Sequence, residues 1–448
     1  MLNMVKHSQI YLFLLGVLVA QSIQGCANPT TQATSTPASI PTASTTPAFI
    51  PVTDTPTPLV PFREDSSCWS VMPLKKGGYI NGSLLFGSSN PAHIFAWDVS
   101  SFQAKTLDKS AQTDWVVSPD GKVIASMPYN ENKLVLTSSS QSKVFLLPKG
   151  DYGGVMEILA NGDIVIIGNT PDFWVRNYVN GAGLTVPYYI FDPITGNLKD
   201  YSVFLSGFTV GVQGSYPFAF SPDMHFVVYN NTPHNGGGDR YTLLDLKTGK
   251  IVWEEPKTPA SLYTADSFPA WKPNTDTLTY ILWSDWYNGF GNYFSVSLDG
   301  AVTQLTKFDQ TTLINPGRGG LLLPSWSPDG RFMAFRIVQP GQSSLYIWDD
   351  QEKMAYKPCL PEENKAYSDY DVYWYFDSNH LFLRLAYPNP QPPGTPTDLL
   401  PATGHIMDLI LDMTTKTILE LPDENNRGGY TSHNGPKVPL GWINWEIP

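Results

Sequence analysis

A short turn motif returns along most of this 448-residue chain, and it restricts the fold more than any other feature. Its clearest copies are Ser118-Pro119-Asp120-Gly121, Ser221-Pro222-Asp223 and Ser327-Pro328-Asp329-Gly330, each placed between two apolar stretches. Proline presets the first corner of a type I turn, aspartate supports the turn by a local hydrogen bond, and glycine relieves the exit. Each copy therefore predicts a β-hairpin.

The spacing of these turns is typical of propeller blades. Weaker copies fill the gaps, so that turns fall near residues 119, 161, 222, 273, 328 and 377, at intervals of roughly 40 to 60 residues. A second recurrent strand ends in an acidic residue, and it returns at 94–98, 189–192, 242–245, 294–299, 345–349 and 409–412. Four strands per unit make one blade.

The two ends of the repeat region complete each other. The first unit, which begins near residue 82, lacks its opening strand, while the strand-like segment 441–447 has no unit of its own. Pairing the last strand into the first blade closes the ring and removes exposed edges. We therefore predict an all-β chain in which residues 62–448 form a single propeller of seven four-stranded blades, with six or eight blades as alternatives.

The repeat also carries a family resemblance. The stretch from Ser325 to Phe335, which reads SWSPDGRFMAF, resembles the WD-type repeat of TolB-like propellers and of the propeller domains of prolyl oligopeptidases. The resemblance covers most of residues 70–448 and implies a fold and little else, because such propellers serve as docking surfaces, substrate gates and enzymes. A role in a Tol assembly is not implied, since TolB proteins lack a lipidated stalk and carry an additional domain.

The N-terminal residues are typical of an exported bacterial lipoprotein. Lys6 precedes an apolar stretch, residues 10–20, that has the length of a signal-peptide core and is too short to span a bilayer. Ser22-Ile23-Gln24-Gly25-Cys26 then resembles a lipobox, in which Cys26 is acylated after removal of a signal peptide, residues 1–25. The alternative is a plain secretory signal that leaves Cys26 free. The expected partner is a membrane, and the expected location is extracytoplasmic, on the bacterial cell membrane or cell surface.

We predict that residues 26–61 form a stalk between the anchor and the propeller. They consist almost wholly of Thr, Pro, Ser and Ala, with Asp54 as the only charge. So little apolar surface cannot offset the entropy of ordering, and the recurrent prolines hold a disordered backbone extended.

Composition and motifs exclude several kinds of function. The formal net charge is −12, with only 28 Lys and Arg, so the chain lacks the basic patch that nucleic-acid binding needs. No His-Glu-x-x-His, Cys-x-x-Cys or Gly-x-Ser-x-Gly motif is present, so we expect no metal, no cofactor and no serine hydrolase. The alternative for the metal is a site assembled at the ring centre from several blades, as in propeller lactonases, which would leave no local motif. Cys68 and Cys359 would lie in an oxidising compartment, and the sequence leaves open whether they form a disulfide.

Three long insertions supply the candidate ligand-binding residues. They fall between the second and third strands of the third, fourth and fifth units, and equivalent connections leave a closed ring on one face. Flat aromatic rings beside polar groups suit a sugar or an extended peptide, although the same aromatics could simply pack the loops. The candidates are Trp174, Arg176, Tyr178, His234, Asp239, Arg240, Trp283, Asp285, Trp286 and Tyr287.

These features favour a surface-anchored, monomeric binding protein without catalytic residues, whose loop face takes a protein or a glycan. One alternative is an exported enzyme acting on polysaccharide or peptide, with Asp239 and Asp285 converging on His234 or Arg176. Another is a structural scaffold of the cell envelope.

Overall fold

Thirty-two strands, β1 to β32, and no helix are present in the residues that the structure describes. This computed structural model describes residues 63–89, 92–108, 113–128, 131–150, 152–168, 184–205, 218–231, 240–255, 270–285, 290–307, 321–339, 342–361, 370–388, 403–422 and 438–445. All of them belong to one compact unit that contains Pro61–Pro448.

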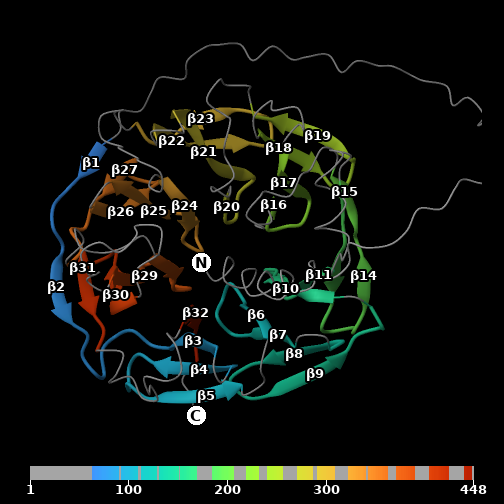
Figure 1. The fold of residues 1–448 in the computed structure, drawn as a ribbon, viewed down its shortest axis with the longest axis horizontal. Coiled ribbons are helices and arrows are strands. Elements are labelled where there is room, and N and C mark those ends of the chain that lie inside the picture. The colour runs from blue at the N-terminus through green and yellow to red at the C-terminus, as the bar shows by residue number, and fades with distance from the viewer. Residues whose placement is uncertain are drawn as a thin grey trace, which may run out of the picture. The chain divides into compact units, whose positions relative to one another are not determined.

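The strands form seven antiparallel four-stranded blades, so the predicted all-β propeller and its blade number are confirmed (Figure 1). In order from first to fourth strand, blade 1 contains β32 (Val438–Ile443), β3 (Ser83–Ser89), β4 (Ala92–Asp98) and β5 (Ala104–Asp108). Blade 2 contains β6 (Thr113–Val117), β7 (Ile124–Pro128), β8 (Lys133–Thr137) and β9 (Ser142–Leu146). Blade 3 contains β10 (Tyr152–Ile158), β11 (Ile164–Gly168), β13 (Tyr188–Phe191) and β14 (Leu198–Asp200).

The remaining four blades follow in chain order. Blade 4 contains β16 (Phe218–Phe220), β17 (Phe226–Asn231), β18 (Arg240–Asp245) and β19 (Lys250–Glu254). Blade 5 contains β20 (Ala270–Lys272), β21 (Thr277–Asp285), β22 (Phe290–Ser297) and β23 (Val302–Gln304). Blade 6 contains β24 (Leu321–Trp326), β25 (Phe332–Gln339), β26 (Gln342–Asp349) and β27 (Met354–Tyr356). Blade 7 contains β28 (Tyr370–Trp374), β29 (His380–Pro388), β30 (Thr403–Asp412) and β31 (Thr417–Glu420).

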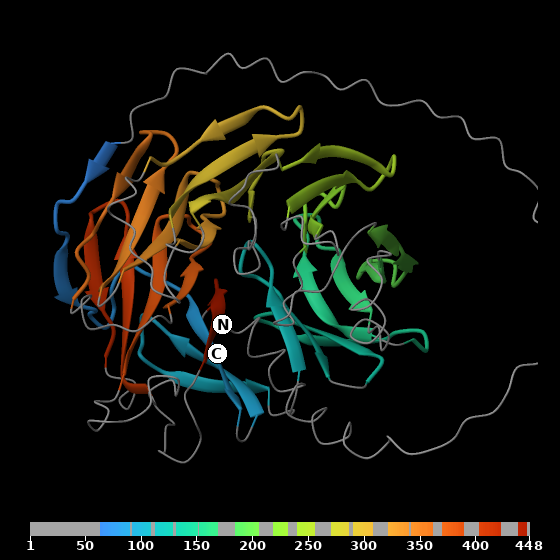
Figure 2. The same ribbon diagram turned by 45° about the horizontal axis from the view of Figure 1, so that its top comes forward.

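The blades stand side by side around the ring (Figure 2). Seven apolar clusters, one between each pair of neighbouring blades, hold the ring together. The blade 7 and blade 1 interface, for example, packs Phe382 and Ile410 against Leu84 and Trp97, and all four side chains are buried. Because side chains alternate between the two faces of a strand, each middle strand contributes side chains to the clusters on both sides of its blade. First strands of adjacent blades contact one another, as β28 does β32 and β32 does β6, so they lie innermost.

The C-terminal strand closes the ring by pairing with β3, as the sequence predicts. Ser83 lies opposite Ile443, and Gly87 lies opposite Val438. The strand begins at Val438, earlier than the predicted 441–447. It also ends earlier, at Ile443, because Asn444 leaves the ladder and its amide donates to the Gly121 carbonyl of blade 2 at 2.9 Å.

An N-terminal strap, residues 63–74, adds a fifth strand to two blades. In it, β1 (Arg63–Asp65) pairs in parallel with β27 on the outer edge of blade 6, and β2 (Ser70–Pro73) pairs in parallel with β31 on that of blade 7. A disulfide between Cys68 and Cys359 joins the strap to blade 6, which answers the question that the sequence left open. Blade 3 carries a separate two-stranded ribbon of β12 (Leu184–Val186) and β15 (Val203–Leu205).

Candidate functional site

The two ends of the ring carry different kinds of connection. Strands alternate in direction and the first strand of every blade is innermost, so all connections from second to third strands leave at one end, here called the loop end. The turns from first to second and from third to fourth strands lie at the other end, here called the turn end. The three insertions connect β11 to β13, β17 to β18, and β21 to β22, and therefore share the loop end.

The candidate ligand-binding residues fall in or beside these insertions. Three of them have a described backbone: Arg240 lies opposite Asn231 at the start of β18, and Trp283 and Asp285 flank a bulge at the end of β21. These positions bring the backbone of the three residues to the loop end of the adjacent blades 4 and 5. The remaining seven candidates lie outside the described residues, and they are Trp174, Arg176, Tyr178, His234, Asp239, Trp286 and Tyr287. The predicted lipidation site, Cys26, also lies outside them.

At the turn end, each Ser-Pro-Asp turn is closed by its own side chains. Ser118 Oγ donates to Asp120 at 2.7 Å, and a backbone amide five residues further on donates to the same hydroxyl at 3.0 Å. Ser221 and Ser327 make the same two contacts. Burial raises the pKa of Asp120, but hydrogen bonds from Lys122 and Ser118 outweigh it and lower the pKa overall. These aspartates therefore stabilise turns.

The acidic residue that recurs at or near the end of the third strand, in every blade except blade 2, also makes local contacts. One carboxylate oxygen of Asp412 accepts the amides of Thr414 and Thr415 at 2.8 and 3.1 Å. Such bonds satisfy turn amides and favour the ionised carboxyl. The same pattern of two successive amides on one carboxylate oxygen occurs at Asp98, Asp192, Asp245 and Asp349.

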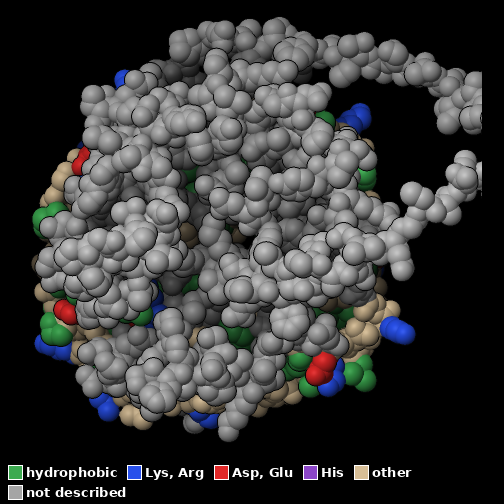
Figure 3. Space-filling view, in the orientation of Figure 1, with side chains coloured by type: hydrophobic (Ala, Val, Ile, Leu, Met, Phe, Trp, Pro, Cys, Tyr) green, Lys and Arg blue, Asp and Glu red, His purple; other side chains and the backbone are tan. Residues whose placement is uncertain are grey.

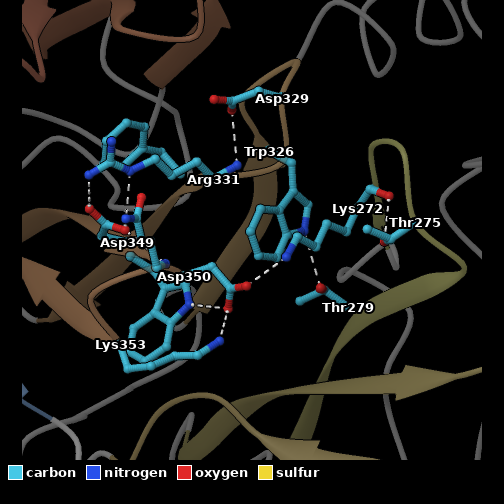
Figure 4. A network of polar contacts seen from close by, with 12 residues as sticks. Lys272, Thr275, Thr279, Trp326, Asp329, Arg331, Asp349, Asp350 and Lys353 are labelled. Atoms are coloured by element: carbon cyan, nitrogen blue, oxygen red, sulfur yellow. Dashed lines mark hydrogen bonds and ion pairs between the residues drawn. The ribbon is translucent and has the colours of Figure 1, made fainter.

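A network of ion pairs joins blades 5 and 6 at the turn end (Figure 4). Asp350 accepts Lys272 Nζ at 2.6 Å, Lys353 Nζ at 2.7 Å and Trp348 Nε1 at 3.2 Å. Burial raises the pKa of Asp350, but its hydrogen bonds to Lys272 and Lys353 lower it overall. Trp326 Nε1 donates to Thr279 of blade 5 at 3.1 Å, so this network fastens two neighbouring blades.

A second polar cluster joins blade 7 to the segment that enters blade 1, and no local motif could have indicated it. His380 Nδ1 lies 2.6 Å from Asp377 and its Nε2 lies 3.8 Å from Asp412, while Tyr79 Oη donates to Asp412 at 2.5 Å. Burial, and then the Asp412 carboxylate, raises the pKa of Tyr79 to about 12.

One described carboxyl differs from all these aspartates. Glu157 lies on β10, the innermost strand of blade 3, beside a bulge and opposite Val165. Burial raises the pKa of its carboxyl to about 7. A carboxyl with such a pKa exchanges protons near neutrality, which makes Glu157 a candidate acid or base that the sequence did not single out.

The described part of the rim shows apolar, basic and acidic side chains (Figure 3). Leu146, Ile194 and Phe204 are 78%, 89% and 56% exposed on the outer part of blades 2 and 3. Within the described part of the chain, no group of three or more His, Cys, Asp or Glu is placed to hold a metal ion, and no helix is long and apolar enough to cross a membrane.

Comparisons with known proteins find similarity to solved structures at low identity. No protein-family model matches the sequence, and no curated protein matches it. TolB from Acinetobacter baumannii is 13% identical, with 79% of each chain covered and a TM-score of 0.38. An oligogalacturonate lyase from Vibrio parahaemolyticus is 12% identical over 78% of this chain and 87% of that chain, with a TM-score of 0.45.

A prolyl endopeptidase is 12% identical over 82% of this chain and 53% of that chain, with a TM-score of 0.47. A TolB and a prolyl endopeptidase are therefore among the solved structures that this chain is similar to, and they are the two kinds of protein whose propellers its repeat resembles. The strand order itself defines the class: this chain is a seven-bladed β-propeller protein.

Proposed function

We propose that this chain is an extracytoplasmic lipoprotein whose propeller binds a protein or a glycan at its loop end. The observation that carries the proposal is the difference between the two ends of the ring. At the turn end, the recurrent aspartates close turns, and Asp350 joins blades 5 and 6. At the loop end, the connections of blades 3, 4 and 5 hold the aromatic and polar residues that suit ligand recognition.

The N-terminal sequence supports the location and the anchor. A signal peptide, a lipobox ending in Cys26 and a Thr/Pro-rich stalk precede the propeller. The disulfide between Cys68 and Cys359 fits an oxidising compartment outside the cytoplasm. The first described residue, Arg63, lies in β1 on the outer edge of blade 6.

An array of glycans and peptides, probed with the full chain in detergent, tests the binding function. We expect the full chain to bind a defined glycan or peptide on the array. We expect the triple variant Trp174→Ala, Trp283→Ala, Trp286→Ala to lose this binding. The structural scaffold that the sequence leaves as an alternative predicts no ligand on the array.

The exported enzyme remains a second candidate because of Glu157. A carboxyl with a pKa of about 7 is suited to protonate a leaving group. A glycosidase mechanism places a second carboxyl about 5 to 10 Å away, on the other side of the scissile bond. Turnover of an array ligand that is abolished by Glu157→Gln, while binding persists, would establish the enzyme in place of the binding protein.

A further inference from the structure

The N-terminal strap is held to the rim by two short strand pairs. β1 pairs with β27 over three residues and β2 pairs with β31 over four. Both strands are exposed apart from Asp65, which is half-buried. Pairing over so few residues, at an edge open to water, is marginally stable by itself.

Between the two pairs, the strap makes one apolar anchor and one covalent bond. Trp69 is buried in the cluster between blades 6 and 7, and its amide donates to the Pro358 carbonyl at 3.1 Å. The neighbouring Cys68 is bonded to Cys359, which directly follows Pro358. An exposed ion pair between Lys416 and Asp65, 3.2 Å long, adds little because water screens it.

The order of these contacts along the chain decides how the strap can detach. The stalk precedes residue 63, so a pull or a thermal opening from that side releases β1 first. Opening then reaches Cys68 before it reaches Trp69 and β2. With the disulfide intact, opening stops at Cys68. Without it, the strap is held by Trp69, by the strand pair of β2, by Leu74, which is buried between blades 7 and 1, and by the chain itself.

We propose that the Cys68–Cys359 disulfide is a covalent stop that keeps the membrane-linked strap on the rim of blades 6 and 7. It makes the junction between stalk and propeller depend on a covalent bond instead of on seven paired residues. The link to the membrane rests on the proposed lipid anchor, whereas the stop itself rests on the described contacts alone.

The turn after β2 offers a place to test this. Lys75 and Lys76 are exposed in this turn, between the strap and β3, which is the next strand along the chain. A recognition sequence for a site-specific protease, inserted between them in the full chain, lets the backbone be cut in the folded protein. After the cut, only the strap contacts and the disulfide join the stalk fragment to the ring fragment.

The measurement compares the cut protein with and without the disulfide, in isolated membranes. We expect the ring fragment to stay with the membranes when the disulfide is intact. We expect at least tenfold more of it in the soluble fraction for the double variant Cys68→Ser, Cys359→Ser. Lys416→Ala, which removes the exposed ion pair with Asp65 and a cation–π contact with Tyr356 but leaves the disulfide, is the control and should not release the ring fragment.

A second arm protects the test against a variant that fails to fold. A dithiol reductant added to the cut wild-type protein converts Cys68 and Cys359 to thiols while its own two thiols form a disulfide, and the ring fragment should then leave. Equal release with and without the disulfide, in either arm, would overturn the proposal.

The outcome for the anchor is read separately. If the uncut chain is already soluble, the proposed anchor is wrong, and the stop is then scored by co-elution of the two fragments from a sizing column. Co-elution that depends on the disulfide supports the stop, and co-elution without it contradicts the stop.

Discussion

Arg384 in β29 donates hydrogen bonds from Nε and from a terminal guanidinium nitrogen to the two carboxylate oxygens of Asp408 in β30, each at 2.7 Å. Both side chains are buried, and the Arg384 guanidinium carbon lies 5.5 Å from the ring centroid of Phe86 in blade 1. The pair therefore sits at the interface where the ring closes, and it satisfies two charges that water does not reach.

Removing one partner of this pair should be costly. Arg384→Met leaves the Asp408 carboxylate buried without its bidentate partner, and we expect a loss of about 3 to 5 kcal/mol in the free energy of unfolding. Urea denaturation measures this loss. Lys122→Met, which removes only the exposed pair with Asp120, is the control and should change the free energy by less than about 1 kcal/mol. Similar losses in the two variants would contradict the account.

A methyl group at Gly82 should disturb the closing strand pair. An added Cβ would lie 2.5 Å from the Ile443 carbonyl oxygen, and Gly82 also has a φ of 93°. At Gly162 the φ is 89°, but no atom would lie within 4 Å of a Cβ. Gly82→Ala should therefore lower the free energy of unfolding by about 2 kcal/mol more than Gly162→Ala does. Thermal and urea unfolding compare the two, and equal losses would show that backbone conformation alone matters.

Acid should destabilise the propeller through its turn aspartates. The pKa values of Asp120, Asp223 and Asp412 are lowered in the folded state, since hydrogen bonds to the ionised carboxyls outweigh burial. The unfolded value is about 3.9, so this stabilisation is complete above that pH and is lost as the pH falls through the lower, folded values. Urea denaturation between about pH 7 and pH 3 should show the fall. Asp412→Asn should reduce its steepness, and an unchanged slope would contradict the role of Asp412.

The sequence predicts the blades well because each is a local unit. Turn motifs such as Ser327-Pro328-Asp329-Gly330 set the hairpins, and the unpaired segment near Trp442 indicates how the ring closes. The sequence did not predict the strap, because no turn links its two short parallel strands to β27 or β31. The pairing of Cys68 with Cys359 was not predictable either, because the two cysteines are 291 residues apart and no local motif links them.

The candidate site was predictable only in part. The loop-end placement of Arg240, Trp283 and Asp285 follows from strand count alone. Glu157 could not be singled out, because its raised pKa depends on burial by residues distant in the sequence. The contact of Tyr79 with Asp412 crosses 333 residues, so no spacing rule reaches it.

Lipidation of Cys26 has a direct biochemical test. When the chain is expressed in a bacterium fed with an alkyne-labelled fatty acid, the label should appear on the protein and the protein should collect with the membranes. Cys26→Ala should lose the label and move to the soluble fraction, while Cys68→Ala should keep the label. Retention of the label in Cys26→Ala would contradict the lipobox.

The loop-end recognition surface is tested most directly by measuring ligand binding in two matched triple variants of the full chain. One carries Trp174→Ala, Trp283→Ala and Trp286→Ala at the loop end, and the other carries Leu146→Ala, Ile194→Ala and Phe204→Ala at exposed rim positions. The account predicts that the first variant, still folded by circular dichroism, loses at least tenfold in affinity for the array ligand while the second binds like wild type. Unchanged binding in the loop variant, or an equal loss in the rim variant, would contradict the loop end as the binding surface.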